Sequence, residues 1–193
     1  MPDNSRRERR PPPLDAQQLE RLALRYVERF ATTRGKLSDY LRRKIRERGW
    51  EGAAADPAAL AERMAALGYV DDRAFAEARA GSMARRGLGE RRVRETLRAA
   101  GVGADDAEAV APGIAAASVA SALAFARRRR LGPFATVPAD RPLREKQLAA
   151  MLRAGHGFAL SRRILDMAPG EARDDVHGEE LTSLARCDDD EPC

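Results

Sequence analysis

Apolar residues return at every third or fourth position through most of the chain. Leu19, Leu22, Ala23 and Tyr26 show this spacing, and charged residues fill the positions between them. That period is typical of amphipathic helices. Alanine, the residue with the highest helix propensity, supplies much of the 44% apolar fraction, and no long alternating Val, Ile or Thr run occurs. We therefore predict an all-α fold.

The periodicity predicts nine helices in three triples. Gly49 and Gly68 supply stop signals, and Pro57 suits a first helical turn. The Pro-Gly pair at 112 and 113 leaves one boundary open. The helices are expected at about 19–30, 37–48, 57–67, 72–86, 90–100, 104–117, 118–130, 142–155 and 158–167.

The middle helices of the triples share a pattern. It reads Leu41-x3-Ile45-x3-Gly49, then Val93-x3-Leu97-x3-Gly101, then Leu148-x3-Leu152 before an offset Gly157. Coincidence remains an alternative, because any amphipathic helix before a glycine cap looks similar. Repetition predicts small units that stack into an elongated body. The expected parts are a disordered basic tail (1–15), three-helix repeats (16–70, 71–117, 118–168) and a disordered acidic tail (169–193).

Charge is unevenly distributed along the chain. Residues 171–193 contain nine Asp and Glu against two Arg, so the formal net charge of +5 becomes +12 for residues 1–170. Such a body attracts polyanions, nucleic acid first, or an acidic protein surface. Codon bias is the alternative source, because Arg outnumbers Lys 32 to 3. Two roles fit the tail's charge: imitation of DNA and shielding of the basic body.

Adjacent carboxylates at Asp71 and Asp72 have two interpretations. As an N-cap, Asp71 accepts a hydrogen bond from a backbone N–H of the following helix, and Asp72 favours the positive helix end. As a catalytic or Mg²⁺-binding pair they need further ligands, and only Glu77 lies nearby in sequence. Capping is the favoured interpretation.

The chain carries no common enzyme signature: no GxxxxGK[ST], HExxH or CxxC pair occurs. Of the two histidines, His156 is expected at a helix end and His177 in the acidic tail. Cys187 and Cys193 lie in that tail without converging histidines, so a metal site is disfavoured and a reducing cytoplasm is expected. We predict no catalytic activity, no metal and no cofactor.

An uncharged stretch, residues 109–126, imitates a membrane span followed by four arginines. The Pro-Gly pair at 112 and 113 interrupts it, and alanine gains little in lipid. No apolar stretch of the signal-peptide type follows the basic N-terminal residues. We therefore expect a cytoplasmic protein that does not enter a membrane.

Three stretches resemble the RecX family of bacterial RecA regulators. They are "LGYVDDRAFAEA" (67–78), "RRGLGERRVRETLRAAGV" (85–102) and "KQLAAMLRAGHGF" (146–158), and the similarity covers about residues 18–167. The "RAGHGF" step departs from the arginine pair and Gly-Phe usual in the family. The positions that carry the resemblance are Leu67, Gly68, Tyr69, Asp71, Asp72, Phe75, Gly89, Arg91, Leu97, Gly101 and Val102.

The resemblance implies three tandem three-helix units in an extended, curved monomer. A protein of this kind lies in the groove of the RecA filament on single-stranded DNA, where it inhibits ATP hydrolysis and strand exchange and limits filament growth. It implies a role in DNA repair, homologous recombination and the SOS response, with no cofactor. Single-stranded DNA is expected to bind weakly or through the filament.

Basic helix faces are the candidate contacts with RecA or DNA, because arginine pairs with carboxylates and phosphates alike. A solvated face is the alternative for any one of them. A helix-turn-helix DNA reader and a scaffold for another protein are the rival functions. The candidate residues are Arg42, Arg43, Lys44, Arg46, Arg85, Arg86, Arg91, Arg92, Arg94, Arg98, Arg127, Arg128, Arg129 and Arg130.

Overall fold

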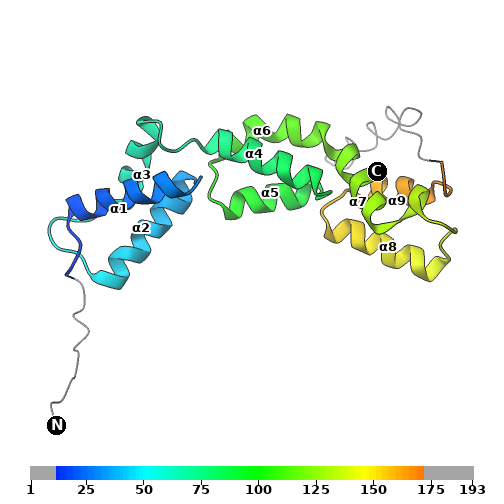
Figure 1. The fold of residues 1–193 in the computed structure, drawn as a ribbon, viewed down its shortest axis with the longest axis horizontal. Helices are drawn as coiled ribbons and strands as arrows, with labels where there is room; N and C mark the ends of the chain where they lie inside the picture. The colour runs from blue at the N-terminus through cyan, green and yellow to red at the C-terminus, as the bar shows by residue number, and fades with distance from the viewer. Residues whose placement is uncertain (1–11, 172–193) are drawn as a thin grey trace, which may run out of the picture. The chain divides into compact units, whose positions relative to one another are not determined.

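The computed structural model describes residues 12–171, and this part of the chain is helical. It contains nine α-helices and one short 3-10 helix (Figure 1). The extended pairing within these residues is a single bridge between Leu14 and Trp50. The all-α expectation is confirmed. The expected tails at residues 1–11 and 172–193 lie outside the described residues.

The described residues divide after Asp72 into two compact units. The first contains three helices, each with an N-cap side chain that accepts a backbone hydrogen bond. The caps are Asp15, Thr33 and Asp56. Each side-chain oxygen accepts a hydrogen bond from the backbone N–H three residues later, at 2.7, 3.1 and 2.9 Å. The helices are α1 (Ala16–Arg29), α2 (Arg34–Arg48) and α3 (Pro57–Ala66).

The core of the first unit is an apolar cluster between α1, α2 and α3. Leu37, Leu41 and Met64 are fully buried in it, and Leu14 joins them at 0% exposure. The backbone N–H of Leu14 donates to the carbonyl of Gly49 at 3.0 Å. Leu14 therefore belongs to the folded part, although the N-terminal tail was expected to run to residue 15.

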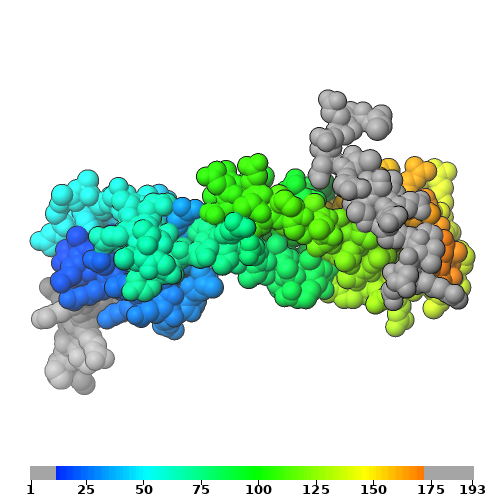
Figure 2. Space-filling view, turned by 90° about the horizontal axis from the view of Figure 1, so that it is seen from above, coloured from blue at the N-terminus to red at the C-terminus, as the bar shows by residue number. Residues whose placement is uncertain are grey.

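The second unit holds the remaining helices. The first residue of α4, Asp72, still belongs to the first unit. Figure 2 shows the residues from α4 to α7, green to yellow-green, packed without interruption. The helices are α4 (Asp72–Arg85), α5 (Glu90–Ala99), α6 (Ala104–Ala116), α7 (Ser118–Arg129), η1 (Gly132–Phe134), α8 (Arg141–Arg153) and α9 (Phe158–Asp166).

Two apolar clusters form inside the second unit. One lies between α4, α5 and α6 around Val93, Leu97 and Ile114, and the other between α7, α8 and α9 around Met151 and Ile164. With the cluster of the first unit, each set of three consecutive helices in the described residues has its own apolar core. The division into three repeats, and the elongated body, remain predictions.

The observed helix boundaries agree with the expected ones to within about three residues. The Pro-Gly pair at 112 and 113 left one boundary open, and α6 continues past the exposed Pro112 to Ala116, close to the expected end. One detail concerning α8 was wrong, because the offset Gly157 was expected to close the helix. The glycine that turns the chain is Gly155, with φ +94°, and Gly157 is the N-cap of α9.

Two turns inside the second unit meet at backbone distance. The α4–α5 turn lies against the α8–α9 turn, where the N–H of Gly89 donates to the carbonyl of Ala154 at 2.9 Å and that of Arg91 to the carbonyl of Gly155 at 3.2 Å. A Cβ atom on Gly89 would lie 2.3 Å from the carbonyl group of Gly155. Glycine is therefore required for this contact, which we call the turn junction.

Within residues 12–171, no single helix is both long and apolar enough to cross a membrane. Only as a pair do Ala104–Ala116 and Ser118–Phe134 reach that length and composition, and they are bent by 58° where they join.

Candidate partner interface

The spacing of the apolar residues in helix α5 explains why its arginines are exposed to solvent. Val93 and Leu97 are buried at 2% and 1% exposure, so the residues between them face away from the core. One arginine lies between them and three flank them, and all four are exposed. Together they form the basic face of this helix. Its members are Arg91, Arg92, Arg94 and Arg98.

The four arginines of α5 do not have equal freedom. Arg94 pairs with Glu90 at 2.5 Å, and Arg92 pairs with Glu95 at 3.3 Å, so two of the positive charges are balanced on the helix. Arg91 donates to the carbonyl of Leu152 at 2.6 Å and fastens α5 to α8. Arg98 has no ion-pair partner among the described residues, which leaves its guanidinium available to a partner.

A groove of about 780 Å³ runs between the arginine face of α5 and the α8–α9 turn. Arg94 and Arg98 line one side, and Gly157 and Phe158 line the other. The ring of Phe158 is 52% exposed. Glu90 and Glu95 also line the groove, but they are paired with Arg94 and Arg92. The groove thus combines guanidinium groups with apolar surface, which suits a protein segment that bears carboxylates beside apolar residues.

The basic residues of α2 form a separate set in the first unit. Arg42 pairs with Asp39 at 2.9 Å, and Arg43 and Lys44 both reach Glu47, at 3.6 and 2.6 Å. Arg46 is exposed. Exposed ion pairs of this kind contribute little to stability. These basic side chains can therefore leave their glutamate or aspartate and pair with a carboxylate or phosphate of a partner at small cost in free energy.

The remaining candidate arginines lie at helix ends of the second unit. Arg85 closes α4, and Arg86 follows it in the turn; both are exposed. In the run at the end of α7, Arg127 lies over the ring of Phe134 at 5.1 Å and Arg129 over that of Phe125 at 5.7 Å. The four arginines therefore point to different sides of the helix and do not form one patch. Arg128 and Arg130 are also exposed.

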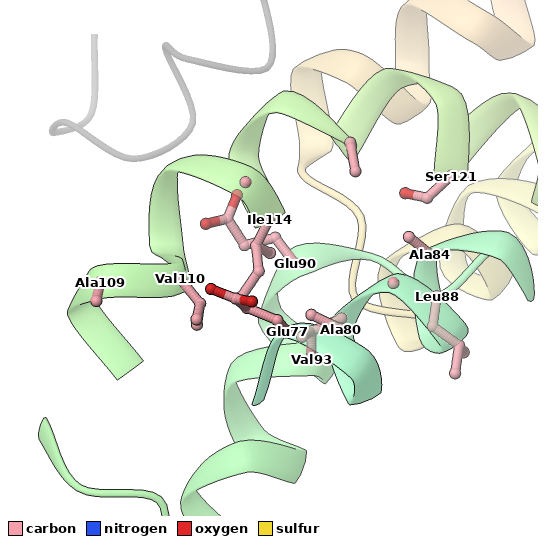
Figure 3. Close-up of a pocket in the computed structure, with 13 residues that line it drawn as sticks. Glu77, Ala80, Ala84, Leu88, Glu90, Val93, Ala109, Val110, Ile114 and Ser121 are labelled. Atoms are coloured by element: carbon pink, nitrogen blue, oxygen red, sulfur yellow. The ribbon is translucent and has the colours of Figure 1, made fainter. Parts of the chain in front are cut away.

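An apolar pocket of about 320 Å³ opens between α4, α5 and α6 (Figure 3). Figure 3 shows the carboxylates of Glu77 and Glu90 beside Val110 and Ile114 at one end. Both carboxylates have arginine partners, since Glu77 pairs with Arg73 at 3.2 Å and Glu90 with Arg94. The pocket therefore offers an apolar slot with a neutralised rim, suited to an apolar side chain.

Asp72 has a larger structural role than the sequence indicated. It is the first residue of α4, as expected for an acid at the positive helix end. Its side chain is only 2% exposed, and its Oδ1 accepts the backbone N–H of Arg34 at 2.8 Å, at the start of α2. Its Oδ2 lies 3.3 Å from the Nε of Arg34. Asp71 precedes α4 directly, and its capping role stays a prediction.

The remaining signature residues lie at helix ends. Gly68 and Gly101 follow α3 and α5 with φ of +79° and +69°, a conformation that glycine adopts without strain. Tyr69 is 54% exposed, and Phe75 is half-buried on α4. They shape chain turns and surfaces and carry no reactive group in the described residues.

His156 was expected only as a helix-end residue, but it is buried in the turn junction. It is 4% exposed, its Nε2 lies 3.2 Å from the carbonyl of Gly87, and its ring meets Phe125 edge-on at 5.6 Å. Burial lowers the pKa of His156 below the usual 6.5, and the hydrogen bond to Gly87 opposes this only in part. The sequence signal for this close contact was the group of glycines at 87, 89 and 155, where an added Cβ atom would lie within 3 Å of neighbouring backbone.

The second unit is expected to lose stability as the pH falls below 6.5. Because the pKa of His156 is lower in the folded chain, the unfolded chain takes up more protons there. Stability from this group is complete above 6.5 and falls with a slope of up to about 1.4 kcal/mol per pH unit. Urea unfolding of the wild type and His156→Gln at several pH values measures it. Identical pH slopes for both proteins would contradict this prediction.

Among residues 12–171, no group of three or more His, Cys, Asp or Glu side chains converges as a metal site would require. The tail cysteines Cys187 and Cys193 lie outside the described residues. What the described chain offers to a partner is therefore charge, apolar grooves and exposed rings.

Comparison with known proteins gives consistent matches. Residues 71–110 match the model of the second three-helix domain of RecX. The chain is 34% identical over 175 residues to the regulatory protein RecX of Myxococcus xanthus, covering 83% of this chain and 91% of that protein. It is 30% identical over 156 residues to that of Agrobacterium fabrum, covering 79% and 84%. For Thermus thermophilus the identity is 40% over 108 residues, covering 56% and 71%.

Proposed function

Because the chain belongs to the RecX family of regulatory proteins, we propose that it regulates the RecA recombinase, mainly as an inhibitor. It binds as a monomer in the groove of the RecA filament on single-stranded DNA. There it suppresses ATP hydrolysis and strand exchange and limits filament growth. These activities need no cofactor and no catalytic residue of this chain, in keeping with relatives that are named regulatory proteins.

The observation that best supports this proposal is the groove beside α5. Its guanidinium groups and the exposed Phe158 ring match a protein surface that alternates carboxylates with apolar side chains. Arg91 holds the groove wall through Leu152, whereas Arg98 is available. The geometry thus separates a structural arginine from one that can reach a partner.

Replacing Arg98 with glutamate is expected to weaken inhibition of the RecA ATPase about tenfold. Loss of one well-aligned guanidinium contact costs on the order of 1.4 kcal/mol, and the new carboxylate repels an acidic partner. The measurement is ATP hydrolysis by RecA on single-stranded DNA, titrated with each protein. Arg141→Glu is the matched control: it makes the same charge change at a 91% exposed α8 side chain, whose ion pair within residues 12–171 is with Glu145.

Equal inhibition by the wild type and the Arg98→Glu protein would remove the groove from the interface. Equal weakening by both variants would show that net charge, not the groove, matters. Reversing all four α5 arginines is a poorer test, because Arg91 anchors α8 and Arg94 balances the half-buried Glu90. A loss of fold would then imitate a loss of binding.

A sequence-specific DNA reader is the second candidate, because α5 is a basic middle helix of a three-helix cluster. Such a reader prefers one duplex over another at fixed salt by a factor of about a thousand or more. A filament regulator binds different duplexes with similar, weak affinity. Duplex selection from a random pool separates the two functions.

A further inference from the structure

Three of the chain's nine aromatic residues gather at one place in the first unit. The sequence contains five Phe, three Tyr and one Trp, and two of the tyrosines lie here with one phenylalanine. Tyr26 and Tyr40 stack at 4.3 Å with an interplanar angle of 22°, and Phe30 lies 5.2 Å from Tyr26. We call these three rings, with the cations around them, the aromatic platform.

The helices explain why the rings meet. Tyr26 and Phe30 are four residues apart at the end of α1, so their side chains leave the same side of the helix. Tyr40 comes from α2, which packs beside α1. Phe30 is the residue after α1, where the backbone turns extended at φ −136° and ψ 124°. Its ring therefore extends the row beyond the last turn.

The row has a buried end and an open end. Tyr26 and Tyr40 are half-buried against the core of the first unit. Phe30 is outside that core and 52% exposed. The Phe30 ring is tilted by 49° against the Tyr26 ring that it contacts. Its exposure costs hydrophobic stabilisation that a ligand can recover.

Cations flank the row. Arg29 lies over the ring of Phe30 at 5.7 Å, and Arg43 and Lys44 lie over the ring of Tyr40 at 5.6 and 5.9 Å. Glu47 pairs with Arg43 and Lys44 and balances one of the three charges. The platform is thus apolar with cations over its rings, and a base that stacks on Phe30 would take the place of the exposed Arg29 over that ring.

A partner that fits must present a flat face and negative charge together. A protein carboxylate gains from the cations but nothing from the face of the Phe30 ring, which is itself electron-rich. An unpaired nucleotide offers both a base that stacks and a phosphate that pairs with arginine or lysine. Paired bases in a duplex are already stacked and cannot reach the ring.

We propose that the aromatic platform binds single-stranded nucleic acid directly, with one unpaired base stacked on Phe30 and the adjoining phosphates held by Arg29, Arg43 and Lys44. The site lies in the first unit and does not involve α5. Through this site the chain binds unpaired DNA strands without the proposed recombinase partner. Stacking has no base-edge contacts, so the site accepts any base sequence.

The test uses the full chain and two single-stranded probes of equal length, an oligothymidylate and an abasic oligomer with the same phosphates. Phe30→Ala is expected to weaken binding to oligothymidylate by about 5- to 100-fold, the loss typical of one stacked base. Binding to the abasic oligomer should not change. Phe30→Trp keeps a ring and should keep the preference for the probe with bases. Arg43→Ala should weaken binding to both probes and reduce the salt dependence.

Phe158→Ala is the matched control, because the Phe158 ring is also 52% exposed but no cation lies over it in the described residues. It should leave the affinity for oligothymidylate unchanged. Any of three results would overturn the proposal. The wild type could bind both probes with equal affinity, Phe30→Ala could lose the same affinity for both probes, or Phe158→Ala could lose as much affinity for oligothymidylate as Phe30→Ala. Inhibition of the RecA ATPase is measured in a separate assay. A protein that binds bases on single strands but does not inhibit RecA would contradict the proposed function and not this inference.

Discussion

Replacing Gly155 with alanine is expected to destabilise the second unit by at least about 3 kcal/mol. Gly155 has φ +94°, which a residue with a Cβ adopts only with strain of about 1–2 kcal/mol. The new methyl group would also lie 2.5 Å from the backbone nitrogen of Arg92. Backbone cannot rotate aside as a side chain does, so the turn junction must open.

The measurement is urea unfolding followed by two signals. Far-UV circular dichroism reports all helices, whereas the single tryptophan, Trp50, reports only the first unit. For Gly155→Ala the helical signal should acquire an earlier transition while the Trp50 transition stays in place. An unshifted helical transition would show that the junction tolerates a methyl group.

Gly113→Ala is the control for this variant. Gly113 lies inside α6 without positive φ, and no atom lies within 4 Å of the position that the new methyl group would occupy. Alanine should stabilise that helix by up to about 1 kcal/mol, because it restricts the unfolded chain and has the higher helix propensity. Opposite signs for the two glycine substitutions separate the junction from a general effect of glycine content.

The positions of the helices were predictable from the sequence, because they depend on the spacing of apolar residues within each short segment. The four-residue spacing of Val93 and Leu97 fixes the buried face of α5 whatever it packs against. The same periodicity was less accurate in α8. Leu148 is partly buried against the core cluster, but the fully buried residue is Met151, because α8 packs against α9 and α7 on that side.

The functional state of individual arginines was less predictable. Arg94 and Arg98 are equivalent in the sequence pattern, yet one is paired and the other is available. The pairing of Arg94 with Glu90 joins residues four apart on one helix, so the sequence could have indicated it. The contact of Arg91 with the carbonyl of Leu152, about 60 residues later in the chain, is set by tertiary packing, which periodicity does not encode.

Asp72→Ala is expected to destabilise the first unit by about 2–3 kcal/mol. The carboxylate accepts the first N–H of α2 and lies against the Arg34 guanidinium while only 2% exposed. Its loss leaves the backbone N–H of Arg34 without this acceptor at the helix end and removes one carboxylate from the Arg34 guanidinium, which keeps its pair with Glu62 at 3.2 Å. A buried donor that loses its acceptor costs more than the hydrogen bond contributes when made. Trp50 fluorescence during urea unfolding measures the change directly.

Asp39→Ala is the comparison that separates burial from charge. Asp39 also pairs with an arginine of α2, at 2.9 Å, but its side chain is 77% exposed. Its loss should change the unfolding free energy by less than about 0.5 kcal/mol, because water replaces the pair. Asp72→Asn keeps an oxygen that can accept the N–H of Arg34, so it should recover part of the stability lost in Asp72→Ala. Equal losses for the Asp72 and Asp39 alanine variants would mean that Asp72 acts only as surface charge.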